Sequence, residues 1–343
     1  MTAARDPVAD LKRIAFLLEA MQEPGYRVRA FRSAASALAD LTPEELADRA
    51  AAGRLRELTG IGEVTERTIL ESLRGEEPVY LRRLESTEGT PQAEGAAELR
   101  AALKGDLHSH TEASDGHVTI REMAEVAIEL GHEYLVITDH SPRLTIANGL
   151  STDRLLAQLD QIARLNEELA PFRLLTGIEV DINEDGSLDQ ADDVLARLDV
   201  VVGSMHSALR MPSAAMTRRM VTAIANPHLD VLGHCTGRMK RRRRNRPEST
   251  FDADIVFAAA ARFDKAIEIN CLPDRLDPPK RLLRLAVESG CRVSIDSDAH
   301  YLGQLAWVRV GCERAFLCGV TPDRIVNAMP LEELLAWTAS HEA

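Results

Sequence analysis

Short apolar runs alternate with longer amphipathic segments along the chain after residue 104. Apolar runs that are bounded by polar residues and separated by helical stretches are typical of buried parallel strands. Strands are expected near residues 105–109, 134–139, 172–181, 199–204, 230–233, 265–270 and 292–296. Helices are expected near residues 118–130, 152–169, 189–197, 213–225, 252–262, 279–289 and 322–339. This alternation predicts an α/β fold in which seven β/α units close into a TIM-like barrel.

The first 86 residues have a different pattern, with apolar positions at helical spacing. Thr42-Pro43-Glu44-Glu45 is typical of a helix start, because proline suits the first helical position. We therefore predict an all-helical domain over residues 1–86. The composition then shifts to Ser, Thr, Gly, Pro, Gln and Glu, so residues 87–104 are interpreted as a linker to a barrel domain at 105–343.

Composition narrows the class of protein. The net charge of −13 argues against a general polyanion-binding surface, although bound divalent cations would reduce its magnitude. The five cysteines are odd in number and lack CxxC spacing, which favours reduced thiols over a disulfide framework. No signal peptide or membrane-length apolar run is evident, so we expect a cytoplasmic protein without a membrane partner.

Imidazoles and carboxylates recur where the predicted strands end. In a closed β/α barrel these ends converge on one mouth, and residues two apart on a strand share a face. His108 and His110 have that spacing, as do Asp298 and His300. The candidate metal ligands are His108, His110, Asp115, His140, Glu179, His206, His234, Asp298 and His300. This donor set suits Zn²⁺, Mn²⁺ or Fe²⁺, and it is large enough for two or three ions that share a bridging carboxylate.

A structural explanation has to be weighed for each candidate. A single histidine at a strand end is usually a core residue, and Asp115 in Ser114-Asp115-Gly116 can be an ordinary turn residue. Six histidines in the same strand-end register favour a multinuclear metal site instead. Clustered divalent ions lower the pKa of coordinated water and hold phosphoryl oxygens, so phosphoester hydrolysis is the expected chemistry.

These residues resemble the metal motifs of the PHP (polymerase and histidinol phosphatase) family. The matching segments, in order, are Asp106-Leu-His-Ser-His110, Thr138-Asp-His140, Gly177-Ile-Glu179, Gly203-Ser-Met-His206, His234 and Asp298-Ala-His300. The resemblance runs from about residue 105 to about residue 337. It implies a distorted seven-stranded barrel with three divalent metal ions at the strand C-termini.

The resemblance also implies which side chains share each ion. His108, His110, Glu179 and Asp298 would hold one ion, and a bridging Glu179 with His206 and His234 would hold a second. Asp115, His140 and His300 would hold the third.

The PHP domain of bacterial family X DNA polymerases is especially similar, since it shares Asn226-Pro-His-Leu-Asp-Val-Leu-Gly-His234 and Glu268-Ile-Asn270-Cys-Leu-Pro-Asp-Arg275. Residues 7–86 resemble the N-terminal domain of those polymerases, including its helix-hairpin-helix, whereas the polymerase palm and fingers between the two parts are missing. The resemblance implies 3′–5′ exonuclease and 3′-end processing activity. Thr68 occupies the place of the Schiff-base lysine in related lyases, so lyase activity is not expected. Cys235 replaces the usual proline after the fifth-strand histidine, which would loosen the loop or place a soft side chain beside the metals.

The turn Gly60-Ile-Gly62 is the candidate DNA contact of the helical domain. Backbone N–H groups at the following helix start can bind a DNA phosphate, and Arg27 and Arg29 add a local basic patch. A plain helical turn is the alternative. Residues 1–87 contain 13 basic and 15 acidic residues, so this domain lacks a strong positive field.

Two arginines are candidates for positioning a phosphate at the barrel mouth. Arg238 begins a basic run that ends at Arg246 and follows the strand of His234, so the run is expected to overhang the metals. Arg275 is the second candidate. A solvated flexible loop is the alternative for the run.

The leading hypothesis is a multinuclear metallophosphoesterase that acts on DNA 3′ ends, with DNA-repair proteins as possible partners. A phosphatase for a small phosphomonoester, such as histidinol phosphate or a nucleotide, is the alternative. A non-catalytic DNA-binding accessory protein is a third hypothesis. The sequence does not decide the native metal, the substrate or the oligomeric state.

Overall fold

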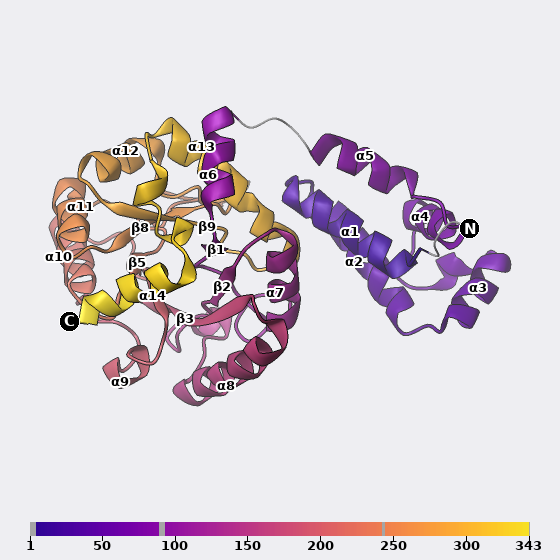
Figure 1. Cartoon of the computed structure of the whole chain (residues 1–343), viewed down its shortest axis with the longest axis horizontal. Coiled ribbons are helices and arrows are strands. Elements are labelled where there is room, and N and C mark those ends of the chain that lie inside the picture. Colours follow the sequence, from indigo (N-terminus) through magenta and orange to yellow (C-terminus); the bar gives the residue numbers. More distant parts are fainter. Residues whose placement is uncertain (1–4, 89–92, 242–243, 343) are drawn as a thin grey trace. The chain divides into compact units, whose positions relative to one another are not determined.

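The structure is a computed structural model that describes residues 5–88, 93–241 and 244–342. It contains two compact units, Met1–Pro91 and Gln92–Ala343 (Figure 1). The first is helical and the second holds a nearly closed parallel barrel, so the predicted fold class is confirmed. None of the helices in the described ranges is long and apolar enough to cross a membrane.

The N-terminal unit is built from short amphipathic helices around one apolar core. They are α1 (Pro7–Ala20), α2 (Gly25–Ala39), α3 (Pro43–Ala51), α4 (Glu63–Leu73) and α5 (Val79–Glu88), with a 3₁₀ turn at Leu55–Glu57. The predicted start of α3 is present as a capping box between Thr42 and Glu45, which satisfies backbone N–H groups that a helix end leaves free. Leu11, Phe31 and Ile69 lie in the core that these helices enclose.

Seven parallel strands form the barrel of the second unit. They are β1 (Gly105–Asp106), β2 (Tyr134–Ile137), β3 (Arg173–Asp181), β4 (Val200–Ser204), β5 (Val231–Leu232), β8 (Ala266–Asn270) and β9 (Arg292–Asp296). Their order in the sheet is β1-β2-β3-β4-β5-β8-β9, which follows the chain. A parallel bridge between Ser109 and Ala299 brings the two edges together just beyond β1 and β9.

Helices cover the outside of these strands, as Figure 1 shows for α7, α8, α10, α11 and α12. The helices after the first strand are α7 (Ile120–Glu129), α8 (Thr152–Leu169), α9 (Asp192–Leu195), α10 (Ser213–Ile224), α11 (Ala253–Arg262), α12 (Lys280–Glu288), α13 (Val308–Leu317) and α14 (Leu331–Ala339). The strands are buried on both faces, which explains why their sequences are mostly apolar. The helix expected at 189–197 is reduced to the four residues of α9.

The expected helix at 322–339 is wrong in its first half. Only α14 is α-helical, and it begins after Pro330. The preceding residues instead fill the seam between β1 and β9, where Asn327 Nδ2 donates to the carbonyls of Gly105 at 3.0 Å and Ile295 at 2.8 Å. Asn327 Oδ1 accepts from the Ile295 N–H, also at 3.0 Å. Tertiary hydrogen bonds to the open strand edges therefore replace the helical ones.

The predicted linker is also shorter than 87–104, and its residues 89–92 lie outside the described residues. Residues Glu94–Ala102 form helix α6, and α6 packs against α13, a helix that the sequence analysis did not predict. Leu99 and Leu103 are buried beside Val308 and Cys312 of that helix. Apolar side chains at helical spacing within a Glu-rich and Ala-rich segment thus hold α6 to the barrel.

His132, between α7 and β2, gives a prediction about acid stability. Its ring is buried without a hydrogen-bond partner, and burial, with the nearby Arg100, lowers its pKa to about 3. The unfolded chain binds this proton near pH 6.5, so between pH 6.5 and 3 acidification favours unfolding, by at most about 1.4 kcal/mol per pH unit. His132→Phe should flatten this dependence, measured by urea unfolding of chelator-treated protein between pH 7 and 4. Parallel pH profiles of the two proteins would contradict the prediction.

Candidate metal centre

The nine candidate ligands converge on the mouth of the barrel. His108 and His110 follow β1, His140 follows β2, and Glu179 lies near the end of β3. His206 and His234 follow β4 and β5, Asp298 and His300 follow β9, and Asp115 lies on the loop after β1. All of these positions except Asp115 lie within a strand or no more than four residues beyond its C-terminal end, and these ends face the same opening.

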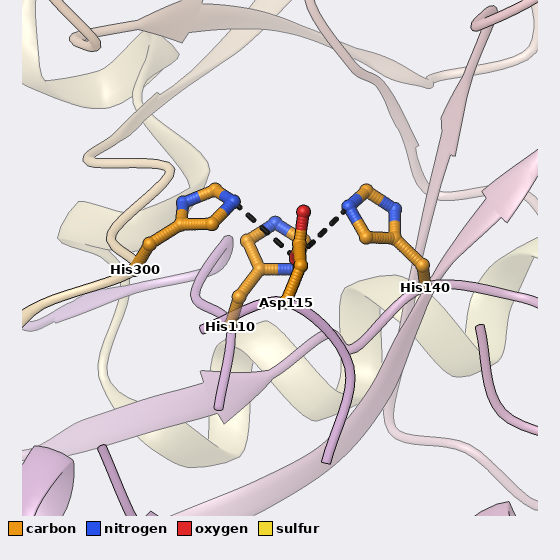
Figure 2. A group of neighbouring side chains, drawn as sticks. All are labelled: His110, Asp115, His140 and His300. Carbon is orange, nitrogen blue, oxygen red and sulfur yellow. Dashed lines mark ion pairs between the residues drawn. The ribbon is translucent and has the colours of Figure 1, made fainter. Parts of the chain in front are cut away.

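One group of side chains surrounds Asp115. Figure 2 shows His110, His140 and His300 around its carboxylate. Asp115 Oδ1 lies 3.4 Å from His140 Nε2, 3.5 Å from His300 Nε2 and 3.9 Å from His110 Nδ1. These four residues offer ligand atoms that all lie within 4.8 Å of one another. The arrangement brings His110 into the group that the resemblance assigned to Asp115, His140 and His300.

Glu179 lies among the other candidate ligands and also contacts His110 and His140 of the first group. Its Oε1 lies 2.8 Å from His234 Nε2 and 3.4 Å from His206 Nε2. Its Oε2 lies 2.8 Å from His140 Nδ1, 3.4 Å from His108 Nε2 and 3.5 Å from His110 Nε2. Asp298 Oδ1 completes this side at 3.3 Å from His110 Nε2. Each oxygen of Glu179 thus faces a different set of imidazoles, which is the geometry that a bridging ligand needs.

Many of the buried imidazole nitrogens have no hydrogen-bond partner. They are Nε2 of His108, both nitrogens of His110, Nδ1 of His140, Nε2 of His206 and Nδ1 of His234. Buried polar atoms are almost always bonded, and several unbonded nitrogens in one place require an explanation. Lone pairs directed at divalent cations provide it, so the donor set fits metal ions.

The electrostatics of the cluster also fit this interpretation. Burial alone would raise the pKa of Glu179, but the surrounding imidazoles outweigh it and hold the pKa well below its ordinary value. Burial lowers the pKa of His140, but Glu179 and Asp115 reverse the effect and raise it to about 10. Burial and the neighbouring imidazoles lower the pKa of His110 to about 4. Metal binding here displaces protons, so metal affinity depends on pH.

Two acidic residues that the sequence analysis left without a role hold candidate ligands in place. Glu268 Oε1 lies 2.5 Å from His108 Nδ1, and its other oxygen accepts from the His234 N–H. Asp181 Oδ1 lies 3.1 Å from His206 Nδ1. A carboxylate on the far nitrogen fixes the orientation of a ligating imidazole. In the sequence, these two residues could have been found as acidic residues within, or at the end of, an otherwise apolar predicted strand.

Asp139 supports the loop that carries Asp115. It accepts hydrogen bonds from the Thr111 N–H at 2.8 Å, the Thr111 hydroxyl at 2.6 Å and Gln158 Nε2 at 2.6 Å. The Ser114 hydroxyl also donates to it. Asp139 thus positions the Asp115 loop through its neighbours.

The two predicted phosphate-binding arginines lie in different environments. Arg275 lines a pocket of about 620 Å³ at the metal cluster, and its Nε lies 3.2 Å from Asp298 Oδ2. Arg238 is not among the described residues that line this pocket. Its Nε donates to the Arg275 carbonyl at 2.8 Å and its Nη2 donates to the Leu276 carbonyl. The structure therefore corrects the role of Arg238, which supports the loop of Arg275 instead of facing the pocket.

The basic run after Arg238 is not an irregular loop. Strands β6 (Met239–Arg241) and β7 (Arg244–Arg246) pair in antiparallel fashion, and residues 242–243 of the run lie outside the described residues. Arg246 lines the same pocket as Arg275, so the run contributes a cation there from its far end.

Cys235 is fully buried, its sulfur lies 3.8 Å from Asp277 Oδ1, and burial raises the pKa of its thiol well above the ordinary value. It is a neutral packing residue.

In the N-terminal unit, Gly60 and Gly62 form the turn before α4. Gly60 has φ +97°, which suits glycine, and Gly62 is the N-cap of α4. The Gly62 N–H donates to Thr65 Oγ1 at 2.9 Å, so it is already bonded within the helix start. Arg29 is exposed and Arg27 is paired with Glu23 at 2.8 Å. Thr68 is buried, and its hydroxyl donates to the Val64 carbonyl.

A β/α barrel with clustered imidazoles and carboxylates at its mouth is typical of metal-binding enzymes. The chain belongs to the PHP domain family, which its residues 106–271 match, and residues 3–77 match a helix-hairpin-helix domain. It is a hydrolase that acts on phosphoric ester bonds, and its barrel mouth binds divalent metal ions.

Relatives include both larger and shorter proteins. The DNA polymerase/3′-5′ exonuclease PolX of Bacillus subtilis is 40% identical over 235 residues, which cover 68% of this chain and 41% of that protein. The chain thus spans less than half of the length of this relative. A probable phosphatase of Caldanaerobacter subterraneus is 31% identical over 218 residues, covering 60% of this chain and 79% of the other.

One solved structure can be added to these relatives. Histidinol phosphate phosphatase from Lactococcus lactis, in complex with zinc, L-histidinol and phosphate, is 15% identical with a TM-score of 0.40. The alignment covers 70% of this chain and 92% of that one.

Proposed function

We propose that this protein is a 3′–5′ exonuclease and 3′-end processing phosphoesterase that acts on DNA. The observation that carries the proposal is the presence, in one chain, of a PHP barrel and a helix-hairpin-helix domain, together with 40% identity to a protein named as a polymerase and 3′-5′ exonuclease. Helix-hairpin-helix turns can bind the DNA backbone without reading sequence, which suits an enzyme that removes successive nucleotides.

We further propose a trinuclear centre with Zn²⁺, Mn²⁺ or Fe²⁺ as the candidate ions. The ligand sets are those that the resemblance implies, with Glu179 as the shared carboxylate. Three groups with ligand atoms within 4.8 Å of one another overlap these sets without including His234 or Asp298: His110, Asp115, His140 and His300; His108, His110 and Glu179; and His140, Glu179 and His206. Asp298 and His234 are placed beside them by the distances of 3.3 Å to His110 Nε2 and 2.8 Å to Glu179 Oε1. Bound divalent ions supply Lewis acidity to the phosphoryl oxygens. The Arg275 guanidinium, buried beside Asp298, binds and orients the phosphate, and Arg246 adds positive charge to the same pocket.

Labelled DNA tests this function. Single-stranded DNA with a 5′ label should shorten progressively from its 3′ end in the presence of Mn²⁺, and His108→Ala or Asp298→Ala should stop the shortening. A generic aryl phosphate serves as a second substrate for the same variants. DNA that stays intact with each of Mn²⁺, Zn²⁺ and Fe²⁺ would contradict the proposal, provided that the protein is folded and has bound the metal.

A small phosphomonoester is the second candidate substrate. It is favoured by the relatives that are named probable phosphatases, of which this chain covers 79% to 89% in two examples. Rapid hydrolysis of small esters with untouched DNA would support this alternative. No turnover of either class of substrate, with any of the metals, would instead support a DNA-binding accessory protein.

A further inference from the structure

The pocket at the metal cluster extends beyond what phosphate hydrolysis requires. Its volume of about 620 Å³ exceeds the space that a phosphate group occupies and falls in the range of small-molecule sites. Much of the remaining lining is aromatic or aliphatic. It consists of His117, Tyr301, Trp307, Leu144, Ile146, Ala147, Met239, Leu272 and Pro273. None of these side chains is among the candidate metal ligands or the arginines proposed to hold the phosphate.

Tyr301 and His117 form a flat surface in this lining. Their ring centroids are 4.2 Å apart and their planes differ by only 19°, so the two rings are stacked. The His117 N–H donates to the carbonyl of His300 at 2.9 Å, and Tyr301 follows His300 directly in the chain. The ring pair is therefore attached to the backbone of a candidate metal ligand, which sets its distance from the metal cluster.

Ile146 belongs to the same pocket but is 94% exposed. It lies on the 3₁₀ turn Thr145–Ala147, and the next residue, Asn148, donates through Nδ2 to the Ala113 carbonyl at 3.1 Å. The turn is thus tied to the loop that carries Asp115. An apolar side chain so exposed gains free energy when a bound ring covers it.

The lining of the pocket combines two kinds of chemistry. Arg275, Arg246 and five of the candidate metal ligands contribute charged or coordinating groups, whereas the ring pair, Trp307 and Ile146 contribute apolar surface. A ligand that matches both has a phosphate joined to a planar, weakly polar ring. A nucleotide has this composition, and aromatic side chains stack on nucleobases without preference for a particular base.

We propose that Tyr301, stacked on His117, is a platform for the nucleobase of the terminal nucleotide and that Ile146 contacts the same base. This inference rests on the proposed function, because it assigns the nucleoside part of the substrate to a subsite of the same pocket. The platform favours nucleotides over phosphomonoesters that lack a planar ring, and it accepts all four bases.

Binding of two small ligands to the Mn²⁺-loaded full-length protein tests the platform. Thymidine 5′-monophosphate carries a base and 2-deoxyribose 5-phosphate does not. By isothermal titration calorimetry, the wild-type protein should bind the nucleotide about 5- to 150-fold more tightly. Tyr301→Leu should bring this ratio close to one, Tyr301→Phe should preserve most of it, and Ile146→Ala should lower it a few-fold. Phe263→Leu, an exposed aromatic residue outside the pocket lining, is the matched control and should keep the wild-type ratio.

The outcomes separate the platform from the DNA substrate. Equal binding of both ligands by the wild-type protein, or an unchanged ratio in Tyr301→Leu, overturns the platform. A ratio that depends on Tyr301, together with DNA that stays intact, supports the platform and overturns the proposed DNA substrate instead.

Discussion

Glu179→Gln is expected to lower kcat/KM for an aryl phosphate by about 10³-fold or more and to reduce the bound metal. The Glu179 carboxylate lies within 3.5 Å of the imidazoles of His108, His110, His140, His206 and His234. Glutamine keeps the shape but replaces one oxygen with an NH₂ group, which cannot coordinate a cation and removes the negative charge. Elemental analysis and steady-state kinetics of the same preparation measure both effects.

Glu184→Gln is the matched control for this substitution. Glu184 is exposed and lies in the turn after β3, so the same chemical change is made five residues away without touching the cluster. We expect wild-type metal content and rate for this variant. If Glu179→Gln also kept its full complement of metal and its rate, Glu179 would not be a bridging ligand, and the assignment of the metal centre would have to be revised.

Glu268→Gln is expected to weaken metal binding by about 10- to 100-fold, although Glu268 is not itself a proposed ligand. Its carboxylate accepts from the His234 N–H, lies 2.5 Å from His108 Nδ1 and accepts from Asn270 Nδ2 at 3.2 Å. Glutamine has only one oxygen to serve these groups, and its NH₂ must face a donor. His108 should then lose its fixed orientation. Competition with a chromogenic chelator measures the metal affinity.

A purely structural role for Glu268 predicts a different result. In that case the substitution would lower the melting temperature of chelator-treated protein while leaving the metal affinity of the folded protein unchanged. A positioning role predicts lower affinity even where the metal-free melting temperatures of variant and wild type agree closely. The two measurements on one preparation therefore distinguish the roles.

Much of the fold was predictable because it follows from local patterns of apolar and polar residues in the sequence. The strands are buried on both faces and their sequences are mostly apolar, so β2, β3, β4, β8 and β9 lie within a few residues of the predicted ranges. The start of α3 was predictable because Thr42 and Glu45 cap the helix locally. These elements depend on near neighbours in the chain, and such interactions are visible in a sequence.

The errors have a common physical origin in contacts between distant residues. Helix α6 was hidden in a polar segment because Leu99 and Leu103 are buried against distant parts of the barrel, including α13. The segment before α14 has a helical pattern, yet Asn327 bonds to strand edges more than 30 and 200 residues away. Arg238 was expected at the pocket, but backbone carbonyls of the Arg275 loop take up its guanidinium.

By itself, the sequence determined the alternation of strands and helices and the strand-end register of imidazoles and carboxylates, because periodicity and residue type are local properties. Only the tertiary structure decided that Glu179 has five imidazoles around it, that Glu268, Asp181 and Asp139 hold the surrounding side chains and loops, and that Arg275 rather than Arg238 lines the pocket. Distances between side chains on different strands depend on the closure and register of the barrel, and these follow from the packing of the whole chain.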